Sequence, residues 1–330
     1  MAGGGAKVIV QAISGNLFIT IIKFIGWFFS HSPSMLAEAI HSLADTFNQI
    51  LLFIGLKQAQ KEANREFSTG MGGASYVWNL VSAVGVFFIG FGVTFYHGMH
   101  SLFSEHFEVG PVSWLGISVL VVSFCIEFWV LLGAIKEVNL SRNGRSFIQF
   151  FKESDDPTVL AVLLEDGVAV LGVVLALIGI VLGQIFGSAI FDIVVSLIIS
   201  FLLAFLAIAL GIINGKLLIG KSLTIHKEAE IKNFVESLDQ VDHVKSLSTK
   251  IIGAGKIRLS MEIELHGENI IDKSSIVLDV KKIENGENIP KVLMKASERM
   301  VRLTGYHINL MEVQIHEKFP EIAFIDLEIN

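Results

Sequence analysis

The sequence predicts an α-helical membrane protein with six transmembrane helices followed by a small cytoplasmic α+β domain. Three observations predict this fold. Hydrophobic residues make up 52% of the 330 residues and charged residues only 17%, against about a quarter in soluble domains. Residues 1–215 contain 23 charged side chains, whereas the shorter stretch 216–330 contains 34. The first two-thirds of the chain also contains long apolar segments of the roughly 20 residues that cross a bilayer.

Six such segments predict a transmembrane domain over residues 1–216; they cover 8–29, 34–56, 75–98, 113–135, 158–183 and 191–214. We expect the first to remain in the protein, because a second span follows it directly. Lys and Arg occur in loops 57–74 and 136–157 and are missing from the intervening loops. Since cytoplasmic loops are enriched in these residues, both termini are predicted to be cytoplasmic. The N-terminus is not transit-like, which favours a bacterial inner (plasma) membrane.

Residues 217–330 are predicted to form the α+β domain. Residues 256–266 alternate apolar and polar side chains, which is typical of a half-buried strand, and a Gly-Ala-Gly turn precedes them. Residues 323–329 alternate in the same way, and residues 228–239 and 290–304 have helical spacing. The histidines of this domain lack the spacing of a metal site; they are His226, His243, His266, His307 and His316.

Several classes of protein are excluded by composition and by missing motifs. A net charge of -7 provides no basic excess for nucleic acid. The single cysteine, Cys125, excludes an internal disulfide and a cysteine-rich metal site. The chain has no HExxH, GxSxG or GxxxxGK[ST] pattern, so neither an enzyme nor a nucleotide-driven pump is indicated.

The second predicted span carries four polar residues on one face: Glu38, His41, Asp45 and Asn48. At 100° per residue they fall within about 80° of one another. His41 and Asp45 are one turn apart, and an imidazole with a carboxylate suits a first-row divalent cation. An ionised group at mid-membrane costs roughly 2.5–3.5 kcal/mol, which indicates function, although a polar patch that packs helices is the alternative.

The fourth and fifth spans add Glu127, Glu165 and Asp166. Glu165 and Asp166 are adjacent and point about 100° apart, and Asp166 is the better ligand candidate. Asp45, Glu127 and Asp166 each lie about 14–18 Å from the same membrane surface at 1.5 Å per residue, which predicts one polar site. Elsewhere, Lys23 is expected to snorkel outward, and Asp192 to cap the sixth span or help a cation leave.

Several strings resemble the cation diffusion facilitator family: SMLAEAIHSLADTFNQ at 34–49, FSTGMGGASYVW at 67–78 and VLLEDGVAVLG at 162–172. Three strings are most similar to one branch of this family, typified by zinc transporter 9. They are VLLEDGVAVLG at 162–172, FGVTFYHGM at 91–99 and IDLEIN at 325–330. The resemblance implies a homodimer that exports Zn²⁺ from the cytoplasm in exchange for protons. It also implies a zinc site between the second and fifth spans and a ferredoxin-like C-terminal domain that dimerises. Zinc is then the transported substrate, and no cofactor is expected.

In the resemblance, His41, Asp45 and Asp166 match the family's metal ligands. The position four residues before Asp166, a histidine or aspartate in the family, is Val162 here. Because zinc prefers four tetrahedral ligands, the fourth is expected from Glu165, Glu127, Asn48 or water, with proton coupling as the alternative role of Glu127. Glu38 lies on the same face as His41 and Asp45.

Three alternatives stay open. Carboxylate-rich sites suit Mn²⁺ or Fe²⁺, and a membrane regulator would sense metal without moving it. The resembled branch also includes a mitochondrial protein, which leaves an organellar membrane as an alternative location.

Overall fold

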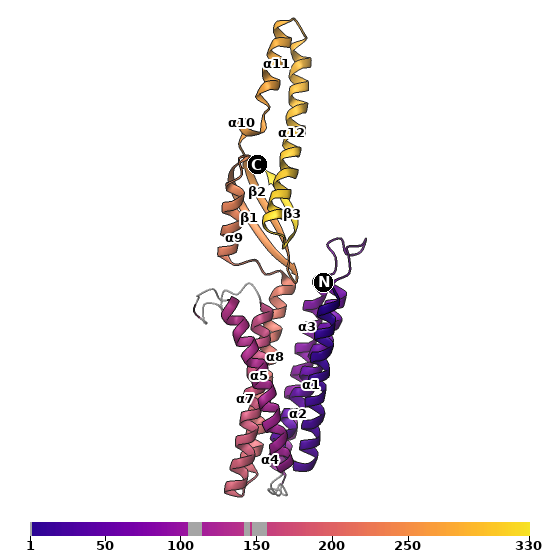
Figure 1. Cartoon of the computed structure of the whole chain (residues 1–330), viewed down its shortest axis with the longest axis vertical. Helices are drawn as coiled ribbons and strands as arrows, with labels where there is room; N and C mark the ends of the chain where they lie inside the picture. Colours follow the sequence, from indigo (N-terminus) through magenta and orange to yellow (C-terminus); the bar gives the residue numbers. More distant parts are fainter. Residues whose placement is uncertain (1, 105–113, 142–145, 147–156) are drawn as a thin grey trace. The chain divides into compact units, whose positions relative to one another are not determined.

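A computed structural model describes residues 2–104, 114–141, 146 and 157–330 of the chain. These residues form two compact units, Met1–Ile219 and Gly220–Asn330 (Figure 1). The first is a bundle of long helices, and the second combines helices with a sheet.

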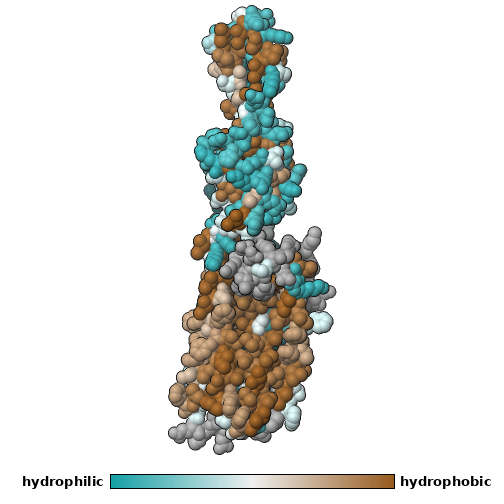
Figure 2. Space-filling model, turned by 90° about the vertical axis from the view of Figure 1, so that its left-hand side faces the viewer, coloured by the Kyte–Doolittle hydropathy of each residue, from teal (hydrophilic) through white to brown (hydrophobic). Residues whose placement is uncertain are grey.

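The helical unit contains six segments, among the described residues, that are long and apolar enough to cross a membrane. Their helices are α1 (Ala2–Ser30), α2 (Pro33–Ala59), the run of α3 (Ala74–Gly85), η1 (Val86–Val93) and α4 (Thr94–Phe103), α5 (Trp114–Ser141), α7 (Pro157–Phe186) and α8 (Ile190–Ile219). Large apolar side chains such as Phe18 and Trp129 are exposed on this unit, and Figure 2 shows that most of its visible surface is hydrophobic. The six predicted spans are therefore confirmed.

Helix α2 lies inside the bundle, where it packs against α1, α3, α7 and α8. Its start follows from local chemistry: the Ser32 hydroxyl accepts a hydrogen bond from the Met35 amide at 3.1 Å, and Pro33 occupies the first turn. Most residues from Pro33 to Ser42 are buried whatever their polarity. The polar side chains of this helix therefore face protein rather than lipid.

The third span contains a π-helical segment, η1, that the sequence did not predict. Such segments disturb the regular α-helical hydrogen bonds and are frequent at functional sites. Phe91 and Phe95 of this run contact Phe201 of α8, with ring centroids 5.9 and 5.6 Å apart. Farther along, Gly98 lets α4 approach α8 closely, because a Cβ there would lie 2.8 Å from Leu197.

The C-terminal unit contains a three-stranded sheet in the order β1 (Val241–Gly253), β2 (Lys256–Leu265) and β3 (Ile322–Ile329). Strands β1 and β2 are antiparallel, and β2 and β3 are parallel. Helices α9 (Ile225–Glu236) and α12 (Ile289–Lys318) share the core with the sheet, while α10 (Gly267–Ile270) and α11 (Lys273–Glu284) lie between β2 and α12 in the sequence. Figure 2 shows a largely hydrophilic surface on much of this unit.

The predicted α+β class is confirmed, and the two predicted strands are present. Leu259, Ile263, Met311 and Ile315 are at the centre of the core and almost completely buried. The order α9-β1-β2-α12-β3 is that of a ferredoxin-like β-α-β-β-α-β unit without its first strand. Strand β1 was not predicted, nor was α11, and α12 is longer than the predicted helix 290–304.

Candidate metal site

The candidate residues on α2 face the inside of the helical bundle. Glu38, His41 and Asn48 are buried, and the side chain of Asp45 is 24% exposed. His41 Nε2 lies 3.5 Å from Asp45 Oδ2, one turn farther along the helix. Neither ring nitrogen of His41 has a hydrogen-bond partner among the described residues. Since an unsatisfied buried polar group costs free energy, this imidazole is suited to bind a cation or a proton.

Asn48 connects α2 to two neighbouring helices. Its side-chain Nδ2 donates to Glu165 Oε1 of α7 at 2.6 Å, and its Oδ1 accepts from the Ser82 hydroxyl of α3 at 2.7 Å. Glu165 therefore contacts the candidate face of α2 directly, although the sequence favoured its neighbour Asp166. Ser82 was missed because a serine in an apolar span carries no signal of its own.

Asp166 on α7 has one buried carboxylate oxygen, Oδ2, without a hydrogen-bond partner in the described part of the chain. Its charge interacts with those of Asp45 and Glu127, and the charge of Glu165 interacts with that of Asp45. No three His, Cys, Asp or Glu side chains among the described residues are grouped closely enough to hold a metal ion. The candidate ligands are therefore electrostatic neighbours, and coordination requires their side chains to converge.

The prediction that Lys23 snorkels outward is wrong. The Lys23 side chain has no exposed surface, and its Nζ lies 2.9 Å from Glu38 Oε2 and 2.7 Å from Glu127 Oε1. Carboxylates on α2 and α5, two helices that each pack against α1, compensate the ammonium within the bundle. The sequence contained a signal for this arrangement, because acidic groups inside a membrane usually pair with an opposite charge.

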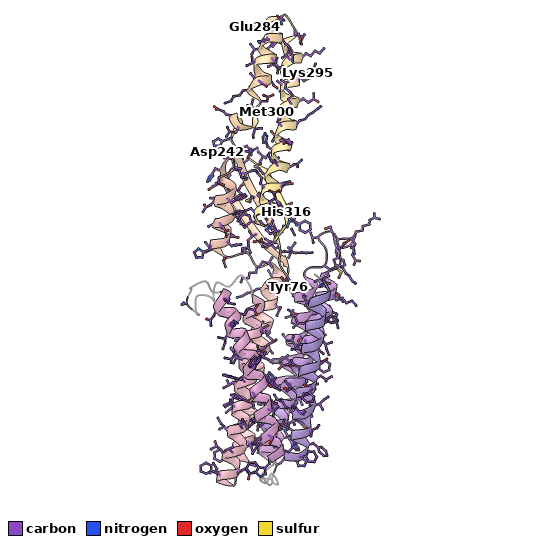
Figure 3. All side chains as sticks on the ribbon, in the orientation of Figure 1. Tyr76, Asp242, Glu284, Lys295, Met300 and His316 are labelled. Atoms are coloured by element: carbon purple, nitrogen blue, oxygen red, sulfur yellow. The ribbon has the colours of Figure 1, made fainter. Side chains whose placement is uncertain are left out.

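A cavity of about 50 Å³ lies beside Asn48 and Glu165. This volume is sufficient for water. Val162 also lines the cavity, as do Tyr76 in the first turn of α3 and Leu217 in the last turn of α8. Tyr76 lies at the end of the bundle that carries loop 57–74 (Figure 3). The cavity thus extends from the candidate residues toward the end of the bundle with the basic loop.

Asp192 lies in the first turn of α8, near the opposite end of the bundle. Its carboxylate accepts a hydrogen bond from the Ser34 hydroxyl of α2. The side chain is almost completely buried. Asp192 therefore links the starts of α2 and α8.

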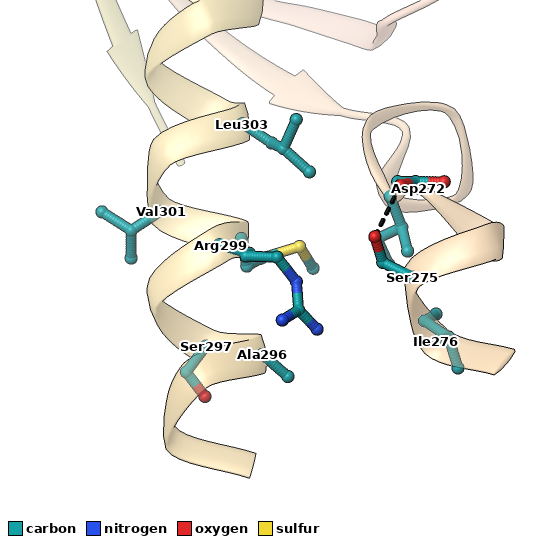
Figure 4. A pocket seen from close by; sticks show the side chains of 10 residues that line it. Asp272, Ser275, Ile276, Ala296, Ser297, Arg299, Val301 and Leu303 are labelled. Atoms are coloured by element: carbon teal, nitrogen blue, oxygen red, sulfur yellow. Dashed lines mark hydrogen bonds between the residues drawn. The ribbon is translucent and has the colours of Figure 1, made fainter. Parts of the chain in front are cut away.

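The C-terminal unit has a separate hollow of about 450 Å³ between α11 and α12 (Figure 4). Ile276, Met300 and Val301 contribute apolar side chains to it. At its edge, Asp272 accepts hydrogen bonds from the amide and hydroxyl of Ser274 and from the hydroxyl of Ser275. These bonds lower the pKa of Asp272 to about 2. The lining is mainly apolar and contains no histidine or cysteine, so it does not resemble a metal site.

The fold and the buried polar groups together define a class of protein. Six candidate spans enclose an imidazole and several carboxylates, and a small α+β domain follows them. This combination is typical of a membrane transporter for cations, in which ionisable groups inside the spans mark the ion pathway.

The chain belongs to the cation efflux family, whose transmembrane-domain model matches residues 9–219. The predicted resemblance to this family of transporters is therefore confirmed, and the family is not one of enzymes.

Curated relatives support the same family over a longer range. The chain is 30% identical to the proton-coupled zinc antiporter SLC30A9, mitochondrial, of Xenopus laevis, over 99% of this chain and 60% of the relative. It is 28% identical to metal tolerance protein C4 of Arabidopsis thaliana, over 98% of this chain and 73% of the relative. The match to the cation-efflux pump FieF of Shewanella oneidensis is 29% identical over 37% of this chain and 40% of the relative. The chain thus spans about three fifths of the length of the SLC30A9 relative.

Proposed function

We propose that this chain is a secondary active transporter that exports Zn²⁺ from the cytoplasm in exchange for protons. One observation carries the proposal: His41 and Asp166 present buried polar atoms beside Asp45 that have no hydrogen-bond partner among the described residues. Such groups are retained in a bilayer where an ion passes. The printed names of the SLC30A9 relatives, which are proton-coupled zinc antiporters, agree with this substrate.

The proposed ligands are His41 and Asp45 from α2 and Asp166 from α7, with Glu165 as the fourth. Asn48 supports this choice, because its hydrogen bond draws the Glu165 carboxylate toward α2. Water or Asn48 itself is the alternative fourth ligand. Glu38 and Glu127 are engaged by Lys23, and we assign them a separate role. One imidazole among oxygen ligands places zinc ahead of Mn²⁺ and Fe²⁺.

Transport proceeds by alternating access around this site. Zn²⁺ reaches it through the cavity beside Asn48, from the end of the bundle that carries loop 57–74. Metal ligands must be deprotonated to bind. Protons arriving from the opposite side therefore compete with Zn²⁺ for His41 and the carboxylates and release it.

A flux assay tests the proposal. The purified chain is reconstituted in liposomes, and Zn²⁺ uptake is measured together with internal pH. We expect zinc movement coupled to an opposite proton movement, and loss of both in Asp45→Ala and in Asp166→Ala while the proteins still fold. Full transport by either variant would contradict the site. Transport of Mn²⁺ or Fe²⁺ in preference to zinc would identify another cargo, and binding without flux would indicate a regulator.

Orientation and assembly are part of the same proposal. The basic loops 57–74 and 136–157 support cytoplasmic termini. They do not distinguish a bacterial plasma membrane, which we favour, from an organellar membrane. A homodimer through the C-terminal domain is supported by exposed apolar side chains on α11 and α12, including Val277, Leu278, Met294 and Val301. Light scattering of the purified chain in detergent measures the oligomeric state. A monomer would contradict the homodimer without affecting the metal site.

A further inference from the structure

Three charged side chains outside the proposed zinc ligands meet inside the bundle. Lys23 of α1 contacts Glu38 of α2 and Glu127 of α5 through its ammonium nitrogen. The side chains of Lys23 and Glu38 have no exposed surface, and that of Glu127 is 12% exposed. Two negative charges are thus held around one positive charge, away from water.

Only one oxygen of each carboxylate contacts the Lys23 ammonium. Glu38 Oε1 and Glu127 Oε2 are buried and have no hydrogen-bond partner among the described residues. Glu38 Oε1 lies against Gly172 of α7, where a Cβ would overlap it. The two glutamates therefore form a preformed pair of oxygen ligands whose centre is taken by an ammonium group.

Without the ammonium, this pair would suit a hard divalent cation. Carboxylate oxygens without nitrogen or sulfur favour Mg²⁺, Ca²⁺ and Mn²⁺. Two uncompensated carboxylates away from water would attract such a cation strongly. A second cation there would also act on the zinc site, because the charge of Glu127 already interacts with those of Asp45 and Asp166.

We propose that Lys23 is a specificity-determining residue, whose ammonium occupies the Glu38–Glu127 pair and denies it to oxygen-preferring divalent cations such as Mg²⁺ and Mn²⁺. Lys23 does not touch the cargo. It confines divalent cations to His41, Asp45 and Asp166, and only this consequence rests on the proposed function. Because the ammonium is attached to the chain and buried, it remains in place at cellular cation concentrations.

Binding of Mn²⁺ to the purified full chain tests the proposal, with electron paramagnetic resonance and equilibrium dialysis as readouts. Lys23→Met keeps a side chain of similar length without the charge. We expect it to bind one more Mn²⁺ per chain than the native protein. Adding Glu127→Gln to Lys23→Met removes the extra ion, and Lys23→Arg does not bind it. Lys136→Met is the matched control, since it removes a positive charge from an exposed position of α5, and it leaves the number unchanged.

A second arm keeps Lys23 and so does not depend on the folding of Lys23→Met. In an Asp45→Ala/Asp166→Ala background, adding Glu38→Gln leaves the amount of bound Mn²⁺ unchanged if the pair is occupied by Lys23. A decrease would overturn the proposal, because the pair would then bind a cation despite the lysine. Equal Mn²⁺ binding by folded Lys23→Met and native protein would overturn it as well. Failure of the transport proposal is recognised separately, as absence of zinc flux in the native chain.

Discussion

The close approach of α7 to α2 predicts that Gly172→Ala destabilises the chain. A Cβ at Gly172 would overlap Glu38 Oε1, while Glu38 Oε2 lies 2.9 Å from Lys23 Nζ. The carboxylate ends a flexible side chain, so the ion pair gives way before the backbone does. Disturbing a buried charged hydrogen bond costs about 1–3 kcal/mol, and Gly to Ala within a helix gains about 0.5–1 kcal/mol. The difference between these two terms is a net loss of up to about 2.5 kcal/mol in the free energy of unfolding.

Thermal and denaturant unfolding of the full chain in detergent measures this effect. Gly211→Ala on α8 is the matched control, because outside the adjacent stretch of its own helix no atom of the described residues lies within 4 Å of a Cβ there, and it is expected to be neutral or stabilising. In a Glu38→Ala background the obstacle is absent, so Gly172→Ala also becomes neutral or stabilising. The two substitutions then show a coupling energy of about 0.5–3 kcal/mol. Strictly additive effects, or a Gly172→Ala protein as stable as the control, would refute the reasoning.

Three further predictions follow from other contacts. Asn48→Leu removes the hydrogen bonds to Glu165 and Ser82, and we expect zinc affinity in the liposome assay to fall about tenfold or more, as for other residues that orient metal ligands; unchanged affinity would argue against Glu165 as a ligand. Ile315→Ala in the completely buried core of the C-terminal unit is expected to cost about 2–5 kcal/mol and Ile315→Val about 0.5–1.5 kcal/mol, measured by denaturant unfolding and circular dichroism. Because the pKa of Asp272 is lowered to about 2, its stabilisation of the start of α11 is fully present above its ordinary pKa of about 4 and is lost as pH falls toward 2. Relative to their intrinsic exchange rates, the first α11 amides should lose protection in that window in the native chain and show no such step in Asp272→Asn, measured by hydrogen exchange.

Elements with a strong and regular pattern could be predicted from the sequence. The apolar segments coincide with the six candidate spans, since a long segment without charge is more stable in lipid whatever its neighbours are. Strand β2 was predicted because Ile257, Leu259, Met261 and Ile263 alternate regularly toward the core. Strand β1 was not predicted, because three register shifts interrupt its pairing with β2 and its burial pattern is irregular.

For the polar residues of the spans, the sequence predicted which side chains share a helix face but not which residues they contact. Helical spacing placed Glu38, His41, Asp45 and Asn48 on one face, and burial of three of them agrees with that placement. Spacing did not indicate that Asn48 contacts Glu165, 117 residues away, or that Lys23 contacts Glu127, 104 residues away. These partners depend on which helices lie side by side.

The six spans, the α+β class of the tail and the family could be recognised from the amino-acid sequence, because each depends on segments whose hydropathy or motif is complete within a short stretch of chain. The acidic groups that remain available for a cation depend instead on how the helices pack together. Lys23 and Glu38 lie on different helices that the bundle packs together, and a buried ammonium takes the nearest carboxylates as partners in the absence of water. In the part of the chain that the structure describes, that packing leaves His41 and Asp166 with polar atoms that have no hydrogen-bond partner. The proposed zinc site is based on these atoms.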